Sequence, residues 1–204
     1  MLLVDFAVLV HPGAGAEKGD RAAGLVPGSV ERHAYQHPSH EAALLGLTSE
    51  QRWVDGVRRR LAAQVGAVPA AVAVRAWREE RGRRRERMAE LLQRARDAGV
   101  LCAVFANAPA SPGRDLAFHG IDADDVFCSA ELGVTAPSPL AFREVAARMG
   151  VPPGRVHYAA AGPVAVAGAR TAGMEVALTA RSAQLAAFLA ALGVDVEAQA
   201  STAA

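Results

Sequence analysis

Five short apolar runs recur along the chain and set its most regular pattern. The first, LLVDFAVLV at 2–10, is rich in branched residues and nearly uninterrupted. Such a run is typical of a strand that is buried on both faces of a parallel sheet. The other four runs lie at 99–107, 125–130, 155–161 and 174–180. We predict that these five runs are the strands of one sheet.

Helical patterns, in which apolar residues recur every three or four positions, separate the later runs. They cover 87–99, 139–150, 165–173 and 182–193. Gly99 and Gly150 end the first two patterns, and glycine is the residue that most easily adopts the left-handed backbone of a helix C-terminus. This alternation predicts an α/β fold, a Rossmann-like parallel sheet with helices on both faces.

The stretch from 16 to 84 interrupts this rhythm. It has no strand pattern, and its helical patterns cover 39–47, 49–66 and 69–81. We therefore predict that an all-helical cap, 16–84, is inserted into an α/β core made of 1–15 and 85–204. The last residues, from about 195 to 204, are expected to form a flexible tail.

The composition narrows the class of protein. Hydrophobic residues make up 51% and charged residues 21% of the chain, and the net charge is +1, so no basic surface for nucleic acid or an anionic membrane is predicted. The first run contains Asp5 and follows no basic residue, unlike a signal peptide, and no apolar stretch is long enough to span a bilayer. The two cysteines lie far apart and indicate reduced, buried thiols. We expect a cytoplasmic protein.

Three motifs, in a fixed order after a strand that ends in Asp5, carry a family resemblance. They are VFANAP at 104–109, GVTAPSP at 133–139 and RVHYAAAG at 155–162. In order, spacing and scaffold residues the chain resembles the haloacid dehalogenase (HAD) superfamily, in particular its capped, phosphatase-like members and the N-terminal domain of epoxide hydrolases. The resemblance covers residues 1 to about 193. It implies a HAD-like core, a cap and an ancestral chemistry of Mg²⁺-dependent phosphoryl transfer to an aspartate.

The same resemblance shows that the catalytic positions are altered. Asp5 matches the nucleophile of the family. Alanine occupies the positions of the general acid and base, the Ser or Thr, the lysine and the metal-holding acids, which are Ala7, Ala106, Ala136, Ala160 and Ala161. Phosphoryl transfer needs cations and a proton donor, which alanine cannot supply. The resemblance therefore implies a degenerate site with neither a metal nor another cofactor.

Polar residues near the expected site are candidates for contact with a ligand. Ligands of an open parallel sheet bind beyond the carboxyl ends of its strands. On that ground, substrate binding is assigned to Asn107, His11, Arg114 and His157. The loss of charged neighbours predicts a wider, more apolar cavity, in which burial raises the pKa of Asp5. Asp5 is then an acid, a base or a nucleophile, or it is a structural carboxylate.

The cap offers two further candidates, and both have a simpler interpretation. Lys18 is the only lysine and lies near the start of the insert, where a solvated side chain is expected. His33 and His37 have the i,i+4 spacing of two metal ligands on one helix face. Pro38 follows directly and no third ligand motif accompanies them, so a polar cap surface is the preferred interpretation.

Two functions stay open on the sequence alone. The first is a metal-independent enzyme or binding protein whose capped pocket takes a small organic molecule, with Asp5 as the surviving reactive group. The second is a non-catalytic pseudoenzyme that serves as a scaffold for a partner protein or a second copy of itself. Neither involves nucleic acid or a membrane.

Overall fold

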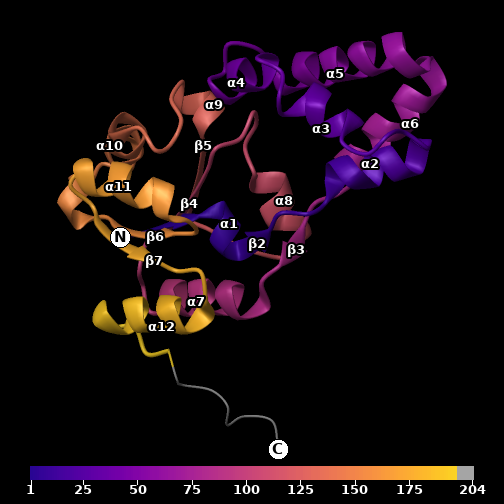
Figure 1. The fold of residues 1–204 in the computed structure, drawn as a ribbon. Helices are drawn as coiled ribbons and strands as arrows, with labels where there is room; N and C mark the ends of the chain where they lie inside the picture. The colour runs from indigo at the N-terminus through magenta and orange to yellow at the C-terminus, as the bar shows by residue number, and fades with distance from the viewer. Residues whose placement is uncertain (197–204) are drawn as a thin grey trace, which may run out of the picture.

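A parallel five-stranded sheet forms the centre of the part of the chain that the computed structural model describes, residues 1–196 (Figure 1). Its strand order is β5–β4–β1–β6–β7, and every neighbouring pair is parallel. The strands are β1 (Leu2–Asp5), β4 (Cys102–Ala106), β5 (Asp125–Cys128), β6 (His157–Ala160) and β7 (Glu175–Leu178). The predicted fold class is confirmed. Residues 197–204 of the predicted tail lie outside the described residues.

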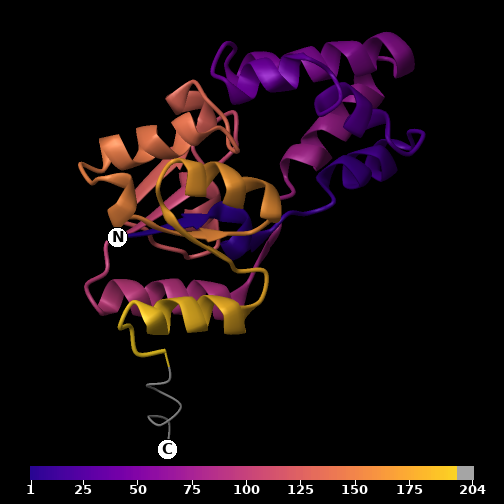
Figure 2. The same ribbon diagram turned by 60° about the vertical axis from the view of Figure 1, so that its left-hand side comes forward.

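Helices cover both faces of this sheet (Figures 1 and 2). One face carries α7 (Glu86–Asp97) and α12 (Ser182–Ala191), and the other carries α10 (Pro139–Arg148) and α11 (Pro163–Thr171). Successive side chains of a strand point to opposite faces. In β1, Leu2 and Val4 accordingly join the core beneath α7 and α12, whereas Leu3 joins the core beneath α10 and α11. This double burial explains the unbroken apolar character of the strand.

The composition of the first apolar run predicts a strand over 2–10, but the strand ends at Asp5. After Asp5 the chain turns into the short helix α1 (Phe6–Leu9) and then into β2 (Val10–His11). The Asp5 side chain accepts a hydrogen bond from the Ala7 amide and so caps α1. A polar side chain at the strand end thus overrides the strand pattern of the residues that follow.

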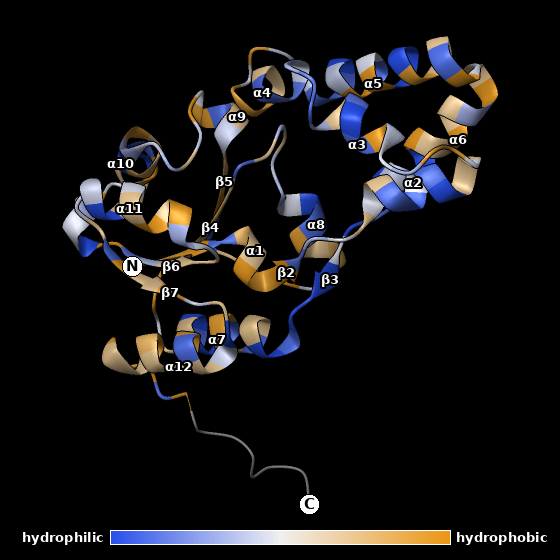
Figure 3. Cartoon of the chain, in the orientation of Figure 1, coloured by the Kyte–Doolittle hydropathy of each residue, from blue (hydrophilic) through white to orange (hydrophobic). Residues whose placement is uncertain are grey.

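Between β2 and β3 (Arg83–Arg84), which pair antiparallel, the described chain forms five helices and no strand. They are α2 (Gly15–Ala23), α3 (Ser29–Ala34), α4 (Ser39–Leu44), α5 (Glu50–Val65) and α6 (Ala67–Arg78). Figure 3 shows hydrophobic and hydrophilic residues alternating along α5 and α6. Their apolar sides enclose a separate core around Trp53, Leu61 and Trp77. The helical character predicted for this insert is confirmed, although α2 and α3 had no predicted counterpart.

Polar contacts hold the returning end of the insert to the sheet region. Arg81 lies 2.6 Å from Asp115 of α8 (Gly113–Phe118), and Arg84 donates to the carbonyl oxygen of His119 at 2.7 Å. The helices α8 and α9 (Ser129–Leu132) were not predicted, because one to two turns are too short to show a periodic pattern. No helix within residues 1–196 combines the length and apolar character that crossing a membrane requires.

Candidate active site at the carboxyl edge of the sheet

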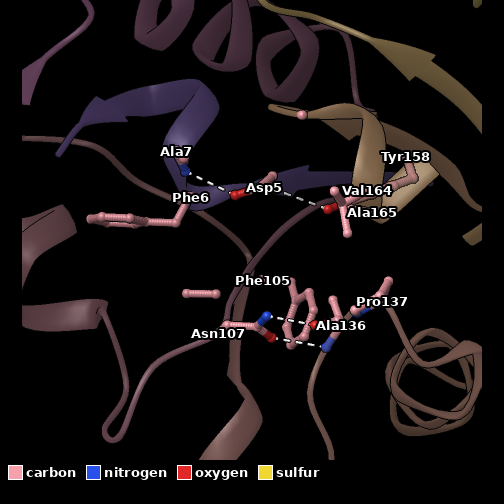
Figure 4. A pocket seen from close by; sticks show the side chains of 12 residues that line it. Asp5, Phe6, Ala7, Phe105, Asn107, Ala136, Pro137, Tyr158, Val164 and Ala165 are labelled. Atoms are coloured by element: carbon pink, nitrogen blue, oxygen red, sulfur yellow. Dashed lines mark hydrogen bonds between the residues drawn. The ribbon is translucent and has the colours of Figure 1, made fainter. Parts of the chain in front are cut away.

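A cavity of about 340 Å³ lies where β1, β4 and β6 end (Figure 4). Its walls come from the strand ends, from the loop before α10 and from the first turn of α11. The lining residues are Asp5, Phe6, Ala7, Phe105, Ala106, Asn107, Ala136, Pro137, Tyr158, Gly162, Val164 and Ala165. The cavity therefore occupies the position at which an open parallel sheet holds its ligands.

Asp5 is the one carboxyl group among these lining residues, and three donors hold it. Its Oδ1 accepts from the Ala7 amide at 3.0 Å, and its Oδ2 accepts from the Tyr158 hydroxyl at 3.3 Å. The backbone N–H of Ala161 also donates to the carboxylate. Burial raises the pKa of Asp5, and these three hydrogen bonds offset only part of that effect. The group is thus positioned and shifted toward its protonated form, as the sequence predicted.

Tyr158 is the polar neighbour that the sequence analysis did not assign to the site. It lies in β6, is almost fully buried, and pairs with Leu3 in the sheet. Burial first, and then the charge of Asp5 and its hydrogen bond, raise the pKa of the Tyr158 phenol. The hydroxyl therefore stays protonated and acts as a donor to Asp5. The pairing register of the sheet is the signal that would have identified Tyr158. Leu3 and Asp5 point to the same face of β1, and the residue paired with Leu3 points to that face too.

Asn107 reaches the cavity, but both ends of its amide are engaged. Its Nδ2 donates to the Ala136 carbonyl at 2.8 Å, and its Oδ1 accepts from the Ala136 amide at 2.9 Å. Figure 4 shows this reciprocal pair closing the wall below Asp5. Asn107 therefore joins the loop after β4 to the loop before α10. A ligand can bond to this amide only through its second N–H or the second lone pair of its oxygen while the pair stays intact.

The alanines that the motif resemblance assigns to functional positions divide into two groups. Ala7, Ala106 and Ala136 line the cavity. Ala160 is fully buried, and Ala161 contributes its backbone N–H to Asp5 instead of a side chain. The N-cap residue of α11, Gly162, and two residues of its first turn, Val164 and Ala165, also line the cavity. They were not predicted from the sequence, because none of the three has a polar atom in its side chain and Val164 and Ala165 follow the motif.

Three residues that were assigned to substrate binding lie away from the cavity lining. His157 is at the amino-terminal end of β6, opposite the edge that holds Asp5, and its Nδ1 lies 3.0 Å from Oε2 of Glu175. His11 is exposed on β2, with Nδ1 2.8 Å from the Pro12 carbonyl oxygen. Arg114 is exposed on α8. These three assignments are corrected, since sequence position near a motif does not decide where a side chain points.

The two cap candidates are engaged in contacts of their own. Lys18 lies 3.4 Å from Glu80 at the other end of the insert. His33 lies 3.1 Å from Gln64, and Nδ1 of His37 lies 2.8 Å from a serine hydroxyl. Within residues 1–196 no group of three His, Cys, Asp or Glu side chains is arranged to hold a metal ion. The histidine pair belongs to the polar surface of the cap.

A magnesium ion, which the phosphatase chemistry of the HAD superfamily would require, does not fit the residues at the cavity. Mg²⁺ demands several oxygen ligands in near-octahedral geometry. Among the described lining residues only Asp5 offers a carboxylate. The carbonyl oxygen of Ala7 accepts a hydrogen bond from the Arg85 guanidinium at 3.3 Å. No step through a metal is derived for this site.

Comparison with known proteins identifies the fold. The sequence matches no protein-family model and no curated protein. Solved structures do match: a 2-haloacid dehalogenase from Pseudomonas syringae has a TM-score of 0.68 at 16% identity, covering 94% of this chain and 98% of that one. A HAD-family enzyme from Bacteroides thetaiotaomicron has a TM-score of 0.65 at 14% identity, covering 86% and 91%.

A third match is an L-2-haloacid dehalogenase from Xanthobacter autotrophicus, solved with chloropropionic acid covalently bound. Its TM-score is 0.60 at 23% identity, and the match covers 88% of this chain and 77% of that one. The chain therefore has the HAD-like fold, as the motif resemblance implied.

Proposed function

We propose that the chain uses the HAD-like fold without its Mg²⁺-dependent phosphatase chemistry. Its capped cavity takes a small organic molecule, and Asp5 exchanges a proton with that molecule. A cavity of about 340 Å³ is at the small end of the range for such ligands. The proposal assigns the chain to metal-independent enzymes or binding proteins of small molecules.

The observation that carries the proposal is the state of Asp5. It is the one Asp, Glu, Lys, Arg or His among the described lining residues, and its pKa is raised by burial. A carboxyl group whose pKa is moved toward neutrality exchanges protons more readily than an ordinary surface aspartate at working pH. Tyr158, held protonated at 3.3 Å, donates to the charged form of Asp5 and fixes its orientation.

Two established chemistries of the fold fit this cavity poorly. Phosphate esters and 2-haloacids are anions, and none of the described lining residues is a lysine, an arginine or a histidine. The covalently bound chloropropionic acid of the Xanthobacter relative supports covalent chemistry on this fold, but the present cavity offers no cationic side chain for such a carboxylate. We therefore place the substrate outside these anionic classes.

A second candidate function is binding without turnover, as in a pseudoenzyme that serves as a scaffold. The observation that favours it is the structural use of Asp5, which caps α1 through the Ala7 amide. On this alternative, the carboxylate stabilises the loop and the ligand is held without reaction. The two candidates differ in whether a neutral replacement of Asp5 abolishes a reaction.

A blocked cavity tests the proposal before the natural substrate is identified. Fragments that bind the ¹⁵N-labelled protein should perturb the amide signals of Ala7, Asn107 and Gly162. Ala165→Phe places a ring in the cavity wall and should abolish those perturbations. Ala167→Phe, an exposed position on the same helix α11, is the matched control and should leave them intact. Fragments that perturb other surfaces only, or that bind equally to the Ala165→Phe variant, would refute the proposal.

Catalysis and binding are then separated with any substrate class that the fragments suggest. Asp5→Asn should abolish turnover while binding at the same amides persists. Persistent turnover in that variant would reject Asp5 as the proton-exchanging group. Binding without any turnover in the wild-type protein would favour the scaffold function.

A further inference from the structure

We infer that the cavity takes the ammonium group of a small organic amine, with the Asp5 carboxylate as its partner. The inference rests on the proposed function, namely that the cavity binds a small organic molecule, and it names the chemical class of that molecule. Neither the phosphate esters nor the haloacids associated with this fold belong to that class.

The charge of the lining favours a cation. Asp5 contributes one negative charge, and no described lining residue contributes a positive one. Arg85 and Lys18 are not among the described lining residues: Arg85 donates to the carbonyl oxygens of Ala7, which lines the cavity, and Ala180, and Lys18 pairs with Glu80. A buried charge is tolerated when it is paired, so a cationic ligand supplies the partner that the protein does not.

Asp5 also retains room for one more donor. An ionised carboxylate offers about four acceptor positions on its two oxygens. Three are taken by Ala7, Ala161 and Tyr158, each of which donates and none of which carries a positive charge. One acceptor position is left, and Asp5 is itself a lining residue of the cavity. A ligand N–H fills it with a charge-assisted hydrogen bond, whereas a ligand carboxylate has no proton to donate.

The remaining walls suit the organic body of an amine. Phe6, Phe105 and Tyr158 are lining residues of the cavity, together with the aliphatic Val164, and Figure 4 shows the Tyr158 side chain reaching toward Asp5. Aromatic faces attract organic cations through their quadrupole, which adds to the charge pairing. The cavity therefore combines one anion with apolar and aromatic walls.

The first turn of α11 is the one feature that favours negative charge. Val164 and Ala165 belong to it, and Gly162 provides no side-chain cap for the helix. A helix N-terminus is equivalent to about half a positive charge, which is less than the full charge of Asp5. Its free amides are donors, so they suit a hydroxyl or carbonyl oxygen of the same ligand. They do not make the cavity a site for anions.

Three ligands of similar size and different charge test the inference on the full chain: benzylammonium, benzyl alcohol and benzoate. Dissociation constants are measured at pH 7 by titration of the amide signals of Ala7, Asn107 and Gly162. We expect benzylammonium to bind at least about tenfold more tightly than benzyl alcohol, and benzoate to bind most weakly. Asp5→Asn should remove the advantage of the ammonium while leaving the affinity for benzyl alcohol within about twofold.

The outcomes separate this inference from the proposed function. If benzyl alcohol or benzoate binds as tightly as benzylammonium, the cavity still takes organic molecules but the preference for amines is wrong. If none of the three perturbs the cavity amides, both the inference and the proposed function are wrong. If the ammonium keeps its advantage in Asp5→Asn, the cation binds elsewhere and the inference is wrong. The comparison of the three ligands needs no variant, so a poorly folded Asp5→Asn protein does not remove the test.

Discussion

Two substitutions of Asp5 should have opposite consequences for stability. Asp5→Asn removes the charge and keeps the shape, whereas Asp5→Ala removes the side chain that caps α1. Because burial raises the pKa of Asp5, the charged form is less favourable in the folded protein than in the unfolded chain. We expect Asp5→Asn to leave the free energy of unfolding at pH 7 unchanged or higher, and Asp5→Ala to lower it.

The hydrogen bonds of Asp5 set the expected change in the free energy of unfolding for each variant. In Asp5→Asn, the amide oxygen keeps the bond from Ala7, and the Tyr158 hydroxyl can rotate to accept from the new NH₂ group. The net change should stay within about 1 kcal/mol, the value of a single neutral hydrogen bond. Asp5→Ala loses an N-cap worth about 0.5–2 kcal/mol. It also leaves Tyr158 and Ala161 without their acceptor, at about 1–3 kcal/mol for a buried donor.

Chemical denaturation and thermal melts of the three proteins measure this difference. Asp5→Ala should lose about 1.5–5 kcal/mol in total, or roughly 3–20 °C in Tm for a chain of this size. The pH dependence of stability gives a second test, because the raised pKa of Asp5 fixes the direction of the change. The stabilisation linked to Asp5 is present below its unfolded pKa of 3.8 and is lost as pH rises through the raised folded value. Asp5→Asn should therefore gain on the wild type between pH 4 and pH 7.

The refuting result is an Asp5→Asn protein as unstable as Asp5→Ala. It would mean that the negative charge itself stabilises the fold, so that the hydrogen bonds at Asp5 outweigh its burial. A wild-type protein that gains stability relative to Asp5→Asn as pH rises from 4 to 7 would lead to the same conclusion.

Three further predictions concern the metal, the packing and the thiols. Added Mg²⁺ at 10 mM should not raise Tm, since only a bound metal would stabilise the folded state by mass action. It should not produce turnover of p-nitrophenyl phosphate either, and turnover that a chelator abolishes would contradict the assignment of the site. Gly168→Ala should lower the free energy of unfolding by about 1–3 kcal/mol or more, because a Cβ there meets the Pro137 carbonyl oxygen, whereas Gly154→Ala should have almost no effect in the same denaturation assay. Cys102 and Cys128 should resist a thiol reagent in the native protein and react fully in denaturant, because both are buried. Burial also raises both thiol pKa values, that of Cys102 to about 12. Rapid reaction of the native protein would indicate local opening of β4 or β5.

The sheet was predictable because its strands and helices carry strong periodic patterns. The run at 99–107 corresponds to β4, whose burial on both faces leaves an unbroken apolar run. The pattern at 87–99 corresponds to α7, which is buried on one side only and so shows apolar residues at helical spacing. The first run was the exception. It remains apolar through α1, so only the capping of Ala7 by Asp5, a contact two residues apart, shows where the strand stops. Hydropathy does not record such a contact.

The site was predictable where motif residues follow strand ends and not elsewhere. Asp5, Ala106 and Asn107 were placed correctly at the carboxyl edge, because the ends of neighbouring parallel strands meet there. His157 was misplaced since it begins its strand rather than ending it. Tyr158 was missed because its role depends on pairing with β1, more than a hundred residues away in the chain. Registers of that kind follow from the whole sheet and not from a local motif.

The position of β1 in the middle of the sheet has a consequence for how the chain folds. Leu2 pairs with Cys102 on one side and with His157 on the other. The central strand therefore cannot pair until segments about 100 and 155 residues further along the chain are available. Closing such loops costs entropy before the contacts form, and folds with many distant pairings fold slowly. The helices of the insert between β2 and β3 mainly contact one another, including α2 with α6, the first and last of them, and all of these partners precede residue 84. We expect the insert to become structured first during synthesis, while β1 is still exposed and prone to aggregation until the second half of the chain emerges.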